Sequence, residues 1–267
     1  MPLQVIQFES STACNTGCFF CPRSSMKRQH GNMSEKLFKS IISQGKDMGV
    51  NRYLPFLNGE PFAFTKIFKW LDYMNEQNVQ VHLYTNASLL TKAKIDRLVN
   101  IGCVRFIYCS LNAATKEIYD KVMPGLDFDK TVKNIKYLIS KRNCTVRVGM
   151  VVNKYTQNEK ELFIKQWGRK SKITRFENWG GQKHDITERT SNRLMCRQLH
   201  NHMAILWDGR VCLCCFDYEG KIVLGDLKKQ TMKQIWENSR SLRYKNQKLK
   251  FDNKLCKDCN FNLKGPV

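Results

Sequence analysis

The sequence lacks any run of about 18 apolar residues, the length that marks a membrane-spanning helix. Its first ten residues, MPLQVIQFES, also lack the basic segment followed by an apolar one that marks a secretory signal. These two absences predict a cytoplasmic protein without a membrane anchor, in a compartment where thiols stay reduced. The 267 residues are 42% apolar, which suits one large domain or one large domain with a small appendage.

Acidic residues are scarce as well. The 23 Asp and Glu residues stand against 45 Lys and Arg residues, which gives a formal net charge of +22 at pH 7. Such an excess is typical of proteins that bind RNA or another polyanion. Alternatively, it is the solvated basic surface of a Lys-rich chain, because the basic residues are scattered and form no single run. Both interpretations stay open here, with nucleic-acid binding the less favoured one.

Short β-rich runs alternate with helical patterns up to about residue 180. Five helical patterns alternate with the strands, the first with Asn32 or Ser34 as its cap and the third with Thr91. Apolar strands in β–α units predict a parallel sheet covered by helices. Because a closed barrel needs eight units, the expected fold is α/β, a partial (β/α)6 barrel of the TIM type. The expected strands cover residues 3–10, 52–58, 79–86, 104–111, 145–153 and 172–179.

Polar or small residues end most of these strands. In parallel α/β folds, ligands bind at the carboxyl ends of the strands, so these residues are expected to ring a single site. They are Glu9, Ser10, Asn58, Gly59, Glu60, Thr85, Asn86, Ser110, Asn112 and Asn153.

Nine of the 12 cysteines form two clusters, and the other three stand alone. Cys103, Cys109 and Cys144 lie in or beside apolar runs and are expected to be small buried side chains. Where thiols stay reduced, clustered cysteines indicate metal ligands or catalytic thiols rather than disulfides. A four-thiolate set from the second cluster suits either zinc or an iron–sulfur cluster, and spacing alone does not decide between them. This cluster contains Cys196, Cys212, Cys214, Cys215, Cys256 and Cys259.

The first cluster has only three cysteines, Cys14, Cys18 and Cys21 in CNTGCFFCP, one fewer than a four-coordinate site uses. This C-x3-C-x2-C motif, with aromatic residues at 19 and 20 and a place after the first strand, closely resembles that of the radical S-adenosylmethionine (SAM) superfamily. The resemblance implies that the three cysteines hold a 4Fe–4S cluster whose fourth iron binds the amino and carboxylate groups of SAM. Electron transfer through that iron would cleave SAM and yield a 5′-deoxyadenosyl radical.

The same resemblance implies a set of SAM-binding residues. NGEP (58–61) is similar to the Gly-Gly-Glu motif of the family, with Asn58 in place of the first glycine. Gly59 would present its backbone to the amino group of SAM, and Glu60 would shape that pocket. Relatives often have Arg near position 123, whereas this chain has Met123, with Lys121 as the nearest cation. The remaining implied residues are Phe20 beside the cluster, Thr85, Asn86, Ser110 and Asn112 at strand ends, and Val151 and Asn153 near adenine.

The C-terminal part resembles the SPASM/twitch extension, which binds auxiliary 4Fe–4S clusters. In the signature of this extension, four residues separate a Gly from the next cysteine ligand. Counted from Gly209, that ligand is Cys214 rather than Cys212 or Cys215. The resemblance implies one auxiliary cluster, because no further cysteine follows Cys259. Its ligands would be Cys196, Cys214, Cys256 and Cys259.

Three segments are expected from these motifs: a barrel over 1–180, a linker over 181–193 and a cluster-binding domain over 194–267. The last would contain a β-hairpin that turns at Asp208-Gly209, a two-residue turn signal, and helices near its end.

A fully ligated second cluster suits electron transfer, so the resemblance implies a two-electron oxidation. Family members with one auxiliary cluster include an aminocyclitol dehydrogenase, and the expected reaction is dehydrogenation of a small polyol or aminosugar alcohol. An electron donor such as flavodoxin or ferredoxin is an expected partner. Peptide-oxidising relatives carry Asp directly after the second auxiliary ligand, where this chain has Cys215, and Asp217 is therefore the expected base.

Two alternatives stay open. One is a maturase that modifies a ribosomally made peptide, although the barrel begins at residue 3 without the leader-recognition domain of many such enzymes. The other is a basic RNA-binding module with structural clusters, which would leave the three-cysteine loop without a purpose.

Overall fold

A computed structural model of the protein describes residues 2–141, 143–182 and 194–261. In the first part of the chain six strands pair in parallel, each with its neighbours in chain order. This arrangement confirms the six expected strands and the partial α/β barrel. The strands are β1 (Val5–Phe8), β2 (Arg52–Leu54), β3 (Gln80–Thr85), β4 (Val104–Ser110), β5 (Thr145–Val152) and β6 (Ser171–Arg175).

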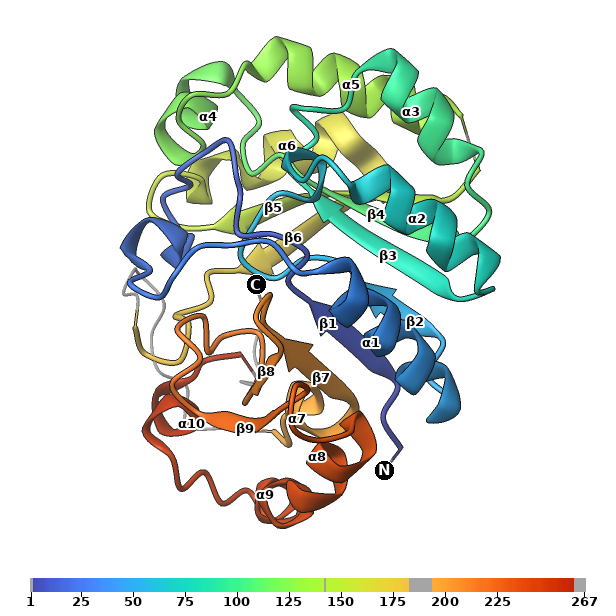
Figure 1. Ribbon diagram of the computed structural model, residues 1–267. Coiled ribbons are helices and arrows are strands. Elements are labelled where there is room, and N and C mark those ends of the chain that lie inside the picture. Colours follow the sequence, from blue (N-terminus) through green and yellow to red (C-terminus); the bar gives the residue numbers. More distant parts are fainter. Residues whose placement is uncertain (1, 142, 183–193, 262–267) are drawn as a thin grey trace.

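Helices cover the outer face of this curved sheet, as Figure 1 shows for α1, α2, α3 and α5. They are α1 (Glu35–Asp47), α2 (Ile67–Glu76), α3 (Lys92–Val99), α4 (Lys116–Val122), α5 (Phe128–Ser140) and α6 (Lys160–Trp167). Short 3-10 turns are η1 (Pro22–Ser25), η2 (Pro61–Ala63), η3 (Gln157–Glu159) and η4 (Gly168–Lys170). Phe38 of α1 stacks on Trp70 of α2 with ring centroids 4.0 Å apart, and such contacts close the outer layer.

Two of the helices begin at caps that the sequence predicted. The Ser34 side chain accepts a hydrogen bond from the amide of Leu37 at 3.2 Å, which decides between the two expected caps of α1. The Thr91 side chain accepts a hydrogen bond from the amide of Lys94 at 3.3 Å and caps α3.

Helix α4 was missed by the sequence analysis. Only Tyr119 and Val122 are buried among its seven residues, too few to give a periodic apolar pattern. Thr115 caps this helix, and its carboxyl end supports the loop that carries the first three cysteines.

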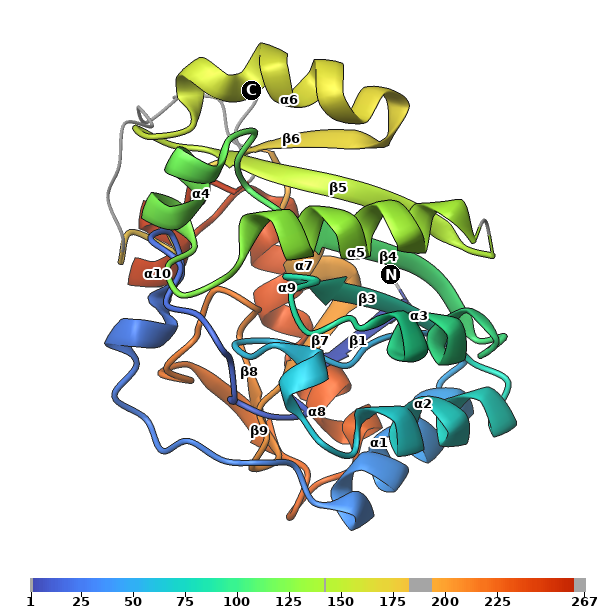
Figure 2. The ribbon, with the colours of Figure 1, turned by 90° about the horizontal axis from the view of Figure 1, so that it is seen from above.

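The C-terminal part continues the barrel sheet. β7 (His202–Ile205) pairs in parallel with β1, and β8 (Arg210–Cys212) and β9 (Val223–Asp226) follow in antiparallel pairs. The sheet thus has nine strands in the order β6-β5-β4-β3-β2-β1-β7-β8-β9, and Figure 2 shows β7 beside β1. The helices of this part are α7 (Arg197–Asn201), α8 (Met232–Asn238), α9 (Arg240–Gln247) and α10 (Lys254–Asp258).

This continuity bears on the expected division of the chain. The hairpin and helices after residue 194 are present, but their strands extend the barrel sheet rather than form a separate one. Residues 183–193 of the expected linker lie outside the described residues. None of the helices that the structure describes has the length and apolar character for a membrane crossing.

The hairpin turn differs from the one expected. Gly209 has φ +97° whereas Asp208 has no positive φ, which excludes the two-residue turn that needs both residues in that region. The amide of Gly209 donates to the carbonyl of Leu206 at 3.0 Å, and the amide of Leu206 donates to the carbonyl of Arg210 at 2.9 Å. The connection is therefore a three-residue loop with a glycine bulge. Gly209 holds the required left-handed position.

Candidate functional site

The first cysteine loop, residues 14–21, lies beyond the carboxyl end of β1. It is anchored on the end of α4 by two hydrogen bonds to main-chain carbonyls. The amide of Phe19 donates to Val122 at 3.0 Å, and the hydroxyl of Thr16 donates to Pro124 at 2.9 Å. The missed helix therefore holds the loop against the top of the barrel.

The three thiols of this loop lie close enough to influence one another. Burial raises the pKa of Cys18, and the charges of Cys21 and Cys14 as thiolates raise it further. A Cβ added at Gly17 would meet no atom within 4 Å, so the loop borders open space. Buried thiolates that repel one another are stabilised by cationic iron, and this set fits a cluster with three protein ligands.

Glu60 connects the end of β2 to the end of β3. Its carboxylate accepts hydrogen bonds from the Thr85 hydroxyl at 2.6 Å and the Asn86 amide at 2.7 Å. Burial raises the pKa of Glu60 to about 7. A Cβ at Gly59 would lie 2.2 Å from the carbonyl oxygen of Ser11, so only glycine fits this close backbone approach. The structure thus brings these expected residues together, with Thr85 and Asn86 holding Glu60 in position.

The other expected SAM-binding residues divide into two groups. Phe20 and Val151 line the lumen of the barrel. Asn112 and Asn153 are buried. The Asn112 side chain accepts a hydrogen bond from the amide of Val151 at 3.1 Å, and the Asn153 side chain accepts one from the amide of Tyr155 at 2.9 Å. Ser110 ends β4 and is half-buried.

The position that holds Arg in many relatives is buried in this chain. Met123 is 1% exposed, and the Asn112 side-chain amide donates to its sulfur at 3.3 Å. Lys121 forms a 2.7 Å ion pair with Glu117 on the exposed side of α4. Neither residue therefore supplies the cation that such relatives use.

Two other cations lie beside the first cysteine loop and were missed from the sequence. Arg23 donates to the carbonyl of Thr12 at 2.7 Å, and its charge lowers the pKa of Cys14, against the larger effect of burial, which raises it. The ammonium of Lys154 lies 5.2 Å from the centre of the Phe19 ring. The sequence offered no motif for either residue, only the position of Arg23 just after Cys21 and that of Lys154 just after β5.

A second, much smaller cavity lies in the C-terminal part. Burial raises the pKa of Cys259 to about 12, and the charges of its cysteine neighbours contribute. No three described His, Cys, Asp or Glu side chains converge tightly enough to hold a single metal ion, so the thiols surround a wider space. The cavity is lined by all four expected auxiliary ligands, Cys196, Cys214, Cys256 and Cys259.

The neighbouring cysteines point elsewhere. Cys212, at the end of β8, is buried with its thiol 3.5 Å from the carbonyl of Ala204. Cys215 lines the barrel lumen. Of the three crowded cysteines, only Cys214 lines the four-cysteine cavity, and its role as a cluster ligand stays a prediction.

Asp217, the expected base, has structural contacts. Its two carboxylate oxygens accept the amides of Lys221 at 2.9 Å and Ile222 at 2.8 Å, which close the turn before β9. Burial raises its pKa, and the side chain does not belong to the lining of the lumen. Its role as a proton acceptor stays a prediction.

The lumen of the open barrel is a cavity of about 890 Å³. Phe56, Tyr84 and Tyr108 form a stack along it, with successive ring centroids 4.8 and 5.1 Å apart. Phe20 of the first cysteine loop borders this space. Phe216 lines both the lumen and the four-cysteine cavity, so one side chain separates them.

Glu177 is the one carboxylate among the described residues that line the lumen. Burial raises its pKa to about 8, and its charge contributes to the raised pKa of Cys215. The two side chains therefore lie near each other at the side of the lumen that faces the second cavity. Sequence reasoning missed Glu177 because it follows β6 without a recognisable motif.

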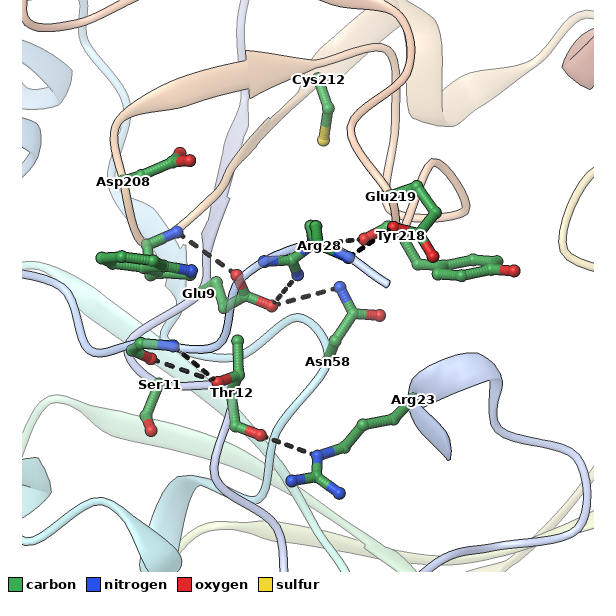
Figure 3. A network of polar contacts seen from close by, with 12 residues as sticks. Glu9, Ser11, Thr12, Arg23, Arg28, Asn58, Asp208, Cys212, Tyr218 and Glu219 are labelled. Carbon is green, nitrogen blue, oxygen red and sulfur yellow. Dashed lines mark hydrogen bonds and ion pairs between the residues drawn. The ribbon is translucent and has the colours of Figure 1, made fainter. Parts of the chain in front are cut away.

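A buried ion pair links the segments around the two cysteine sites. The Arg28 guanidinium contacts the Glu9 carboxylate at 2.5 Å and donates to the carbonyl of Tyr218. Glu9 also accepts the side-chain amide of Asn58 at 3.2 Å and the main-chain amide of Trp207 at 3.3 Å. Figure 3 shows Glu9 at the centre of this network. Asn58, which departs from the family motif, thus contributes to the link.

Two family models match the chain. Residues 8–165 match the radical SAM superfamily, and residues 196–260 match the SPASM iron–sulfur cluster-binding domain. Among curated proteins, the S-adenosyl-L-methionine-dependent 2-deoxy-scyllo-inosamine dehydrogenase of Niallia circulans is 24% identical over 267 residues. The match covers 96% of this chain and 92% of the relative.

Solved structures show the same fold. BtrN in complex with AdoMet and 2-DOIA superposes with a TM-score of 0.68 at 19% identity, over 97% of this chain and 94% of BtrN. Streptococcus suis SuiB bound to precursor peptide SuiA gives a TM-score of 0.77 at 16% identity, over 97% of this chain and 70% of SuiB.

Proposed function

This chain belongs to the radical SAM superfamily, and from that premise we propose that it dehydrogenates an alcohol group of a small polyol or aminosugar. The observation that carries the proposal is the position of Phe216 between the lumen and the four-cysteine cavity. A substrate in the lumen would lie one side chain away from the second cysteine set while it contacts Phe20 of the first loop. This short path suits the loss of two electrons from one substrate.

When bound, the two 4Fe–4S clusters and SAM supply a radical that abstracts hydrogen and an acceptor for the second electron. We assign Cys14, Cys18 and Cys21 to the first cluster. Aromatic side chains such as Tyr84 and Tyr108 narrow the lumen and exclude water from the reacting carbon. We assign Cys196, Cys214, Cys256 and Cys259 to the auxiliary cluster.

Oxidation of an alcohol also releases a proton. Glu177 borders the lumen beside Cys215, where a carboxylate would reach a substrate hydroxyl. Both carboxylate oxygens of Asp217 accept hydrogen bonds from main-chain amides. We therefore propose Glu177 as the proton acceptor and Asp217 as the residue that shapes the loop.

The named relative supports a small substrate, because a 2-deoxy-scyllo-inosamine dehydrogenase matches this chain over nearly its whole length. Modification of a peptide is the second candidate. It is favoured by the TM-score of 0.77 with SuiB bound to its precursor peptide and by a lumen of about 890 Å³. For either reaction we propose an external one-electron donor such as flavodoxin or ferredoxin.

The test uses anaerobically reconstituted protein with SAM, a reductant and polyols or aminosugars that carry deuterium on the carbinol carbon. We expect a ketone and 5′-deoxyadenosine in equal amounts, with the deuterium transferred to 5′-deoxyadenosine. The Cys18→Ala variant, as the control, should form neither product. A product isomeric with the substrate would contradict dehydrogenation, and deuterium transfer from a peptide alone would favour the second candidate.

A further inference from the structure

The lumen carries a strong excess of positive charge on one wall. Arg147 of β5, Arg169 of η4, and Lys172 and Arg175 of β6 all line it. Glu177, at the side of Cys215, is the one carboxylate among the lining residues that the structure describes. This wall is therefore cationic, whereas the acidic group lies toward the second cysteine cavity.

The strand register places two of these cations on the inner face of the sheet. Arg147 pairs with Tyr108, and Lys172 pairs with Gly149, so each shares a face with its partner. A Cβ at Gly149 would lie 1.8 Å from the Tyr108 hydroxyl, which means that the phenol crosses Gly149 toward β6, where Thr174 forms a hydrogen bond with it. The glycine thus permits a phenol and an ammonium to face the same space.

The charges of Arg147, Arg169 and Lys172 are not neutralised by ion pairs among the described residues. One guanidinium nitrogen of Arg147 donates to the main-chain carbonyl of Arg169, which fixes the side chain without removing its charge. None of the ion pairs found in the described parts of the chain includes Arg147, Arg169 or Lys172. Lys172 and Arg169 are exposed and Arg147 is half-buried, so this cationic wall is accessible from solvent. Such a surface attracts anions and repels ammonium groups.

We infer that the substrate carries an oxyanion, a phosphate or a carboxylate, which binds Lys172 and Arg147 on the β5–β6 wall. The inference rests on the proposed function, because it assigns a chemical class to the alcohol that is oxidised. Arg guanidinium groups bind such oxyanions with paired hydrogen bonds, and Lys adds a mobile charge.

The two cations lie at different depths below the first cysteine loop. At about 3.3 Å per residue, Gly149 and its partner Lys172 lie about 7 Å below Val151 along β5, and Arg147 lies about 13 Å below it. A small polyol with its reacting carbon near Phe20 and Val151 would therefore reach Lys172 with its oxyanion.

The test measures binding, independently of turnover. Reconstituted protein with excess SAM, which occupies the open iron, is dialysed against labelled inorganic phosphate, acetate or methylammonium at low ionic strength. Variants are Lys172→Gln and Arg147→Gln, with Lys172→Arg as the conservative change. Lys165→Gln on the exposed side of α6 is the matched control, because it removes the same charge outside the lumen.

We expect saturable binding of phosphate or acetate and no binding of methylammonium. The anion with the lower Kd, phosphate or acetate, identifies the oxyanion of the substrate. Lys172→Gln and Arg147→Gln should each raise the Kd roughly tenfold or more, the worth of one charge-assisted hydrogen bond. Lys172→Arg should restore binding, and Lys165→Gln should change the Kd less than about twofold.

Three results would overturn the inference: no saturable anion binding, an equal loss in Lys165→Gln, or preferential binding of methylammonium. Formation of 5′-deoxyadenosine is measured on the same samples. If it persists while anions fail to bind, the substrate class is wrong and the radical chemistry stands. If anions bind and no 5′-deoxyadenosine forms, the anion site stands and the proposed function fails.

Discussion

The indole nitrogen of Trp179 donates a 2.9 Å hydrogen bond to the main-chain carbonyl of Phe20, which ties the chain after β6 to the first cysteine loop. The same ring meets Phe216 edge-on, with centroids 5.4 Å apart, and Phe216 lines the second cysteine cavity. Trp179 thus contacts the surroundings of both cysteine sites. Through these two contacts, Trp179 links the first cysteine loop to a residue that lines the second cavity.

Trp179→Phe should separate the hydrogen bond from the ring contact. The variant keeps an aromatic ring for Phe216 and leaves the Phe20 carbonyl without its donor, so we expect the free energy of unfolding to fall by about 0.5–1.5 kcal/mol. Trp179→Ala should lower it further. Urea unfolding under anaerobic conditions measures both. Equal stability of Trp179→Phe and the wild type would show that the hydrogen bond contributes nothing.

The buried pair of Glu9 and Arg28 should be far more costly to break than a surface pair. Arg28→Met leaves the Glu9 carboxylate buried without its cation, and we expect a loss of about 3–5 kcal/mol in the free energy of unfolding. Glu9→Gln combined with Arg28→Met should recover part of this loss, since no unpaired charge then remains.

Lys39→Ala, which breaks the exposed pair with Glu35, is the control and should have little effect. The same urea unfolding experiment measures all three variants. A loss in Arg28→Met as small as in this control would refute the structural role of the buried pair.

Cys214→Ala should lose the auxiliary cluster, whereas Cys212→Ala should keep it. Only Cys214 lines the cavity with Cys196, Cys256 and Cys259, and Cys212 packs against β7 instead. Iron and sulfide analysis of anaerobically reconstituted protein should show about half of the wild-type content in the first variant. Iron loss in Cys212→Ala alone would mean that the ligand assignment is wrong.

Glu177→Gln and Asp217→Asn should separate the two candidate bases. Glu177→Gln should slow product formation by roughly 10²–10⁴-fold, the usual contribution of a general base, and leave SAM cleavage intact. Asp217→Asn keeps one acceptor for the main-chain amides and should mainly lower stability. Product and 5′-deoxyadenosine are quantified together for both variants. The opposite pattern, with product loss in Asp217→Asn alone, would restore the base expected from the sequence.

Much of the fold followed from local patterns. The six parallel strands and the caps Ser34 and Thr91 were predictable, because apolar periodicity and side-chain caps act within a few residues. The pairing of β7 with β1 was not, since it joins segments almost 200 residues apart. The bulged turn at Gly209 was mistaken for a two-residue turn because both use Asp-Gly sequences.

The candidate site was predictable only where a motif carried it. Spacing identified both cysteine sets, and the structure then placed Cys214 in the second cavity. Lys172 and Glu177, in and just after β6, line the lumen together with Phe216 of the C-terminal part, without any local signature. Asp217 had a motif-based argument, but hydrogen bonds within its own turn engage its carboxylate.

The most direct test of the central claim is the formation of 5′-deoxyadenosine from SAM by the reduced, reconstituted protein. We expect about eight iron atoms and about eight sulfides per chain, as two 4Fe–4S clusters require. We also expect slow SAM cleavage even without substrate. Cys18→Ala should abolish that cleavage. Cleavage in Cys18→Ala at the wild-type rate, or a wild-type protein that fills with zinc and forms no 5′-deoxyadenosine, would contradict the account.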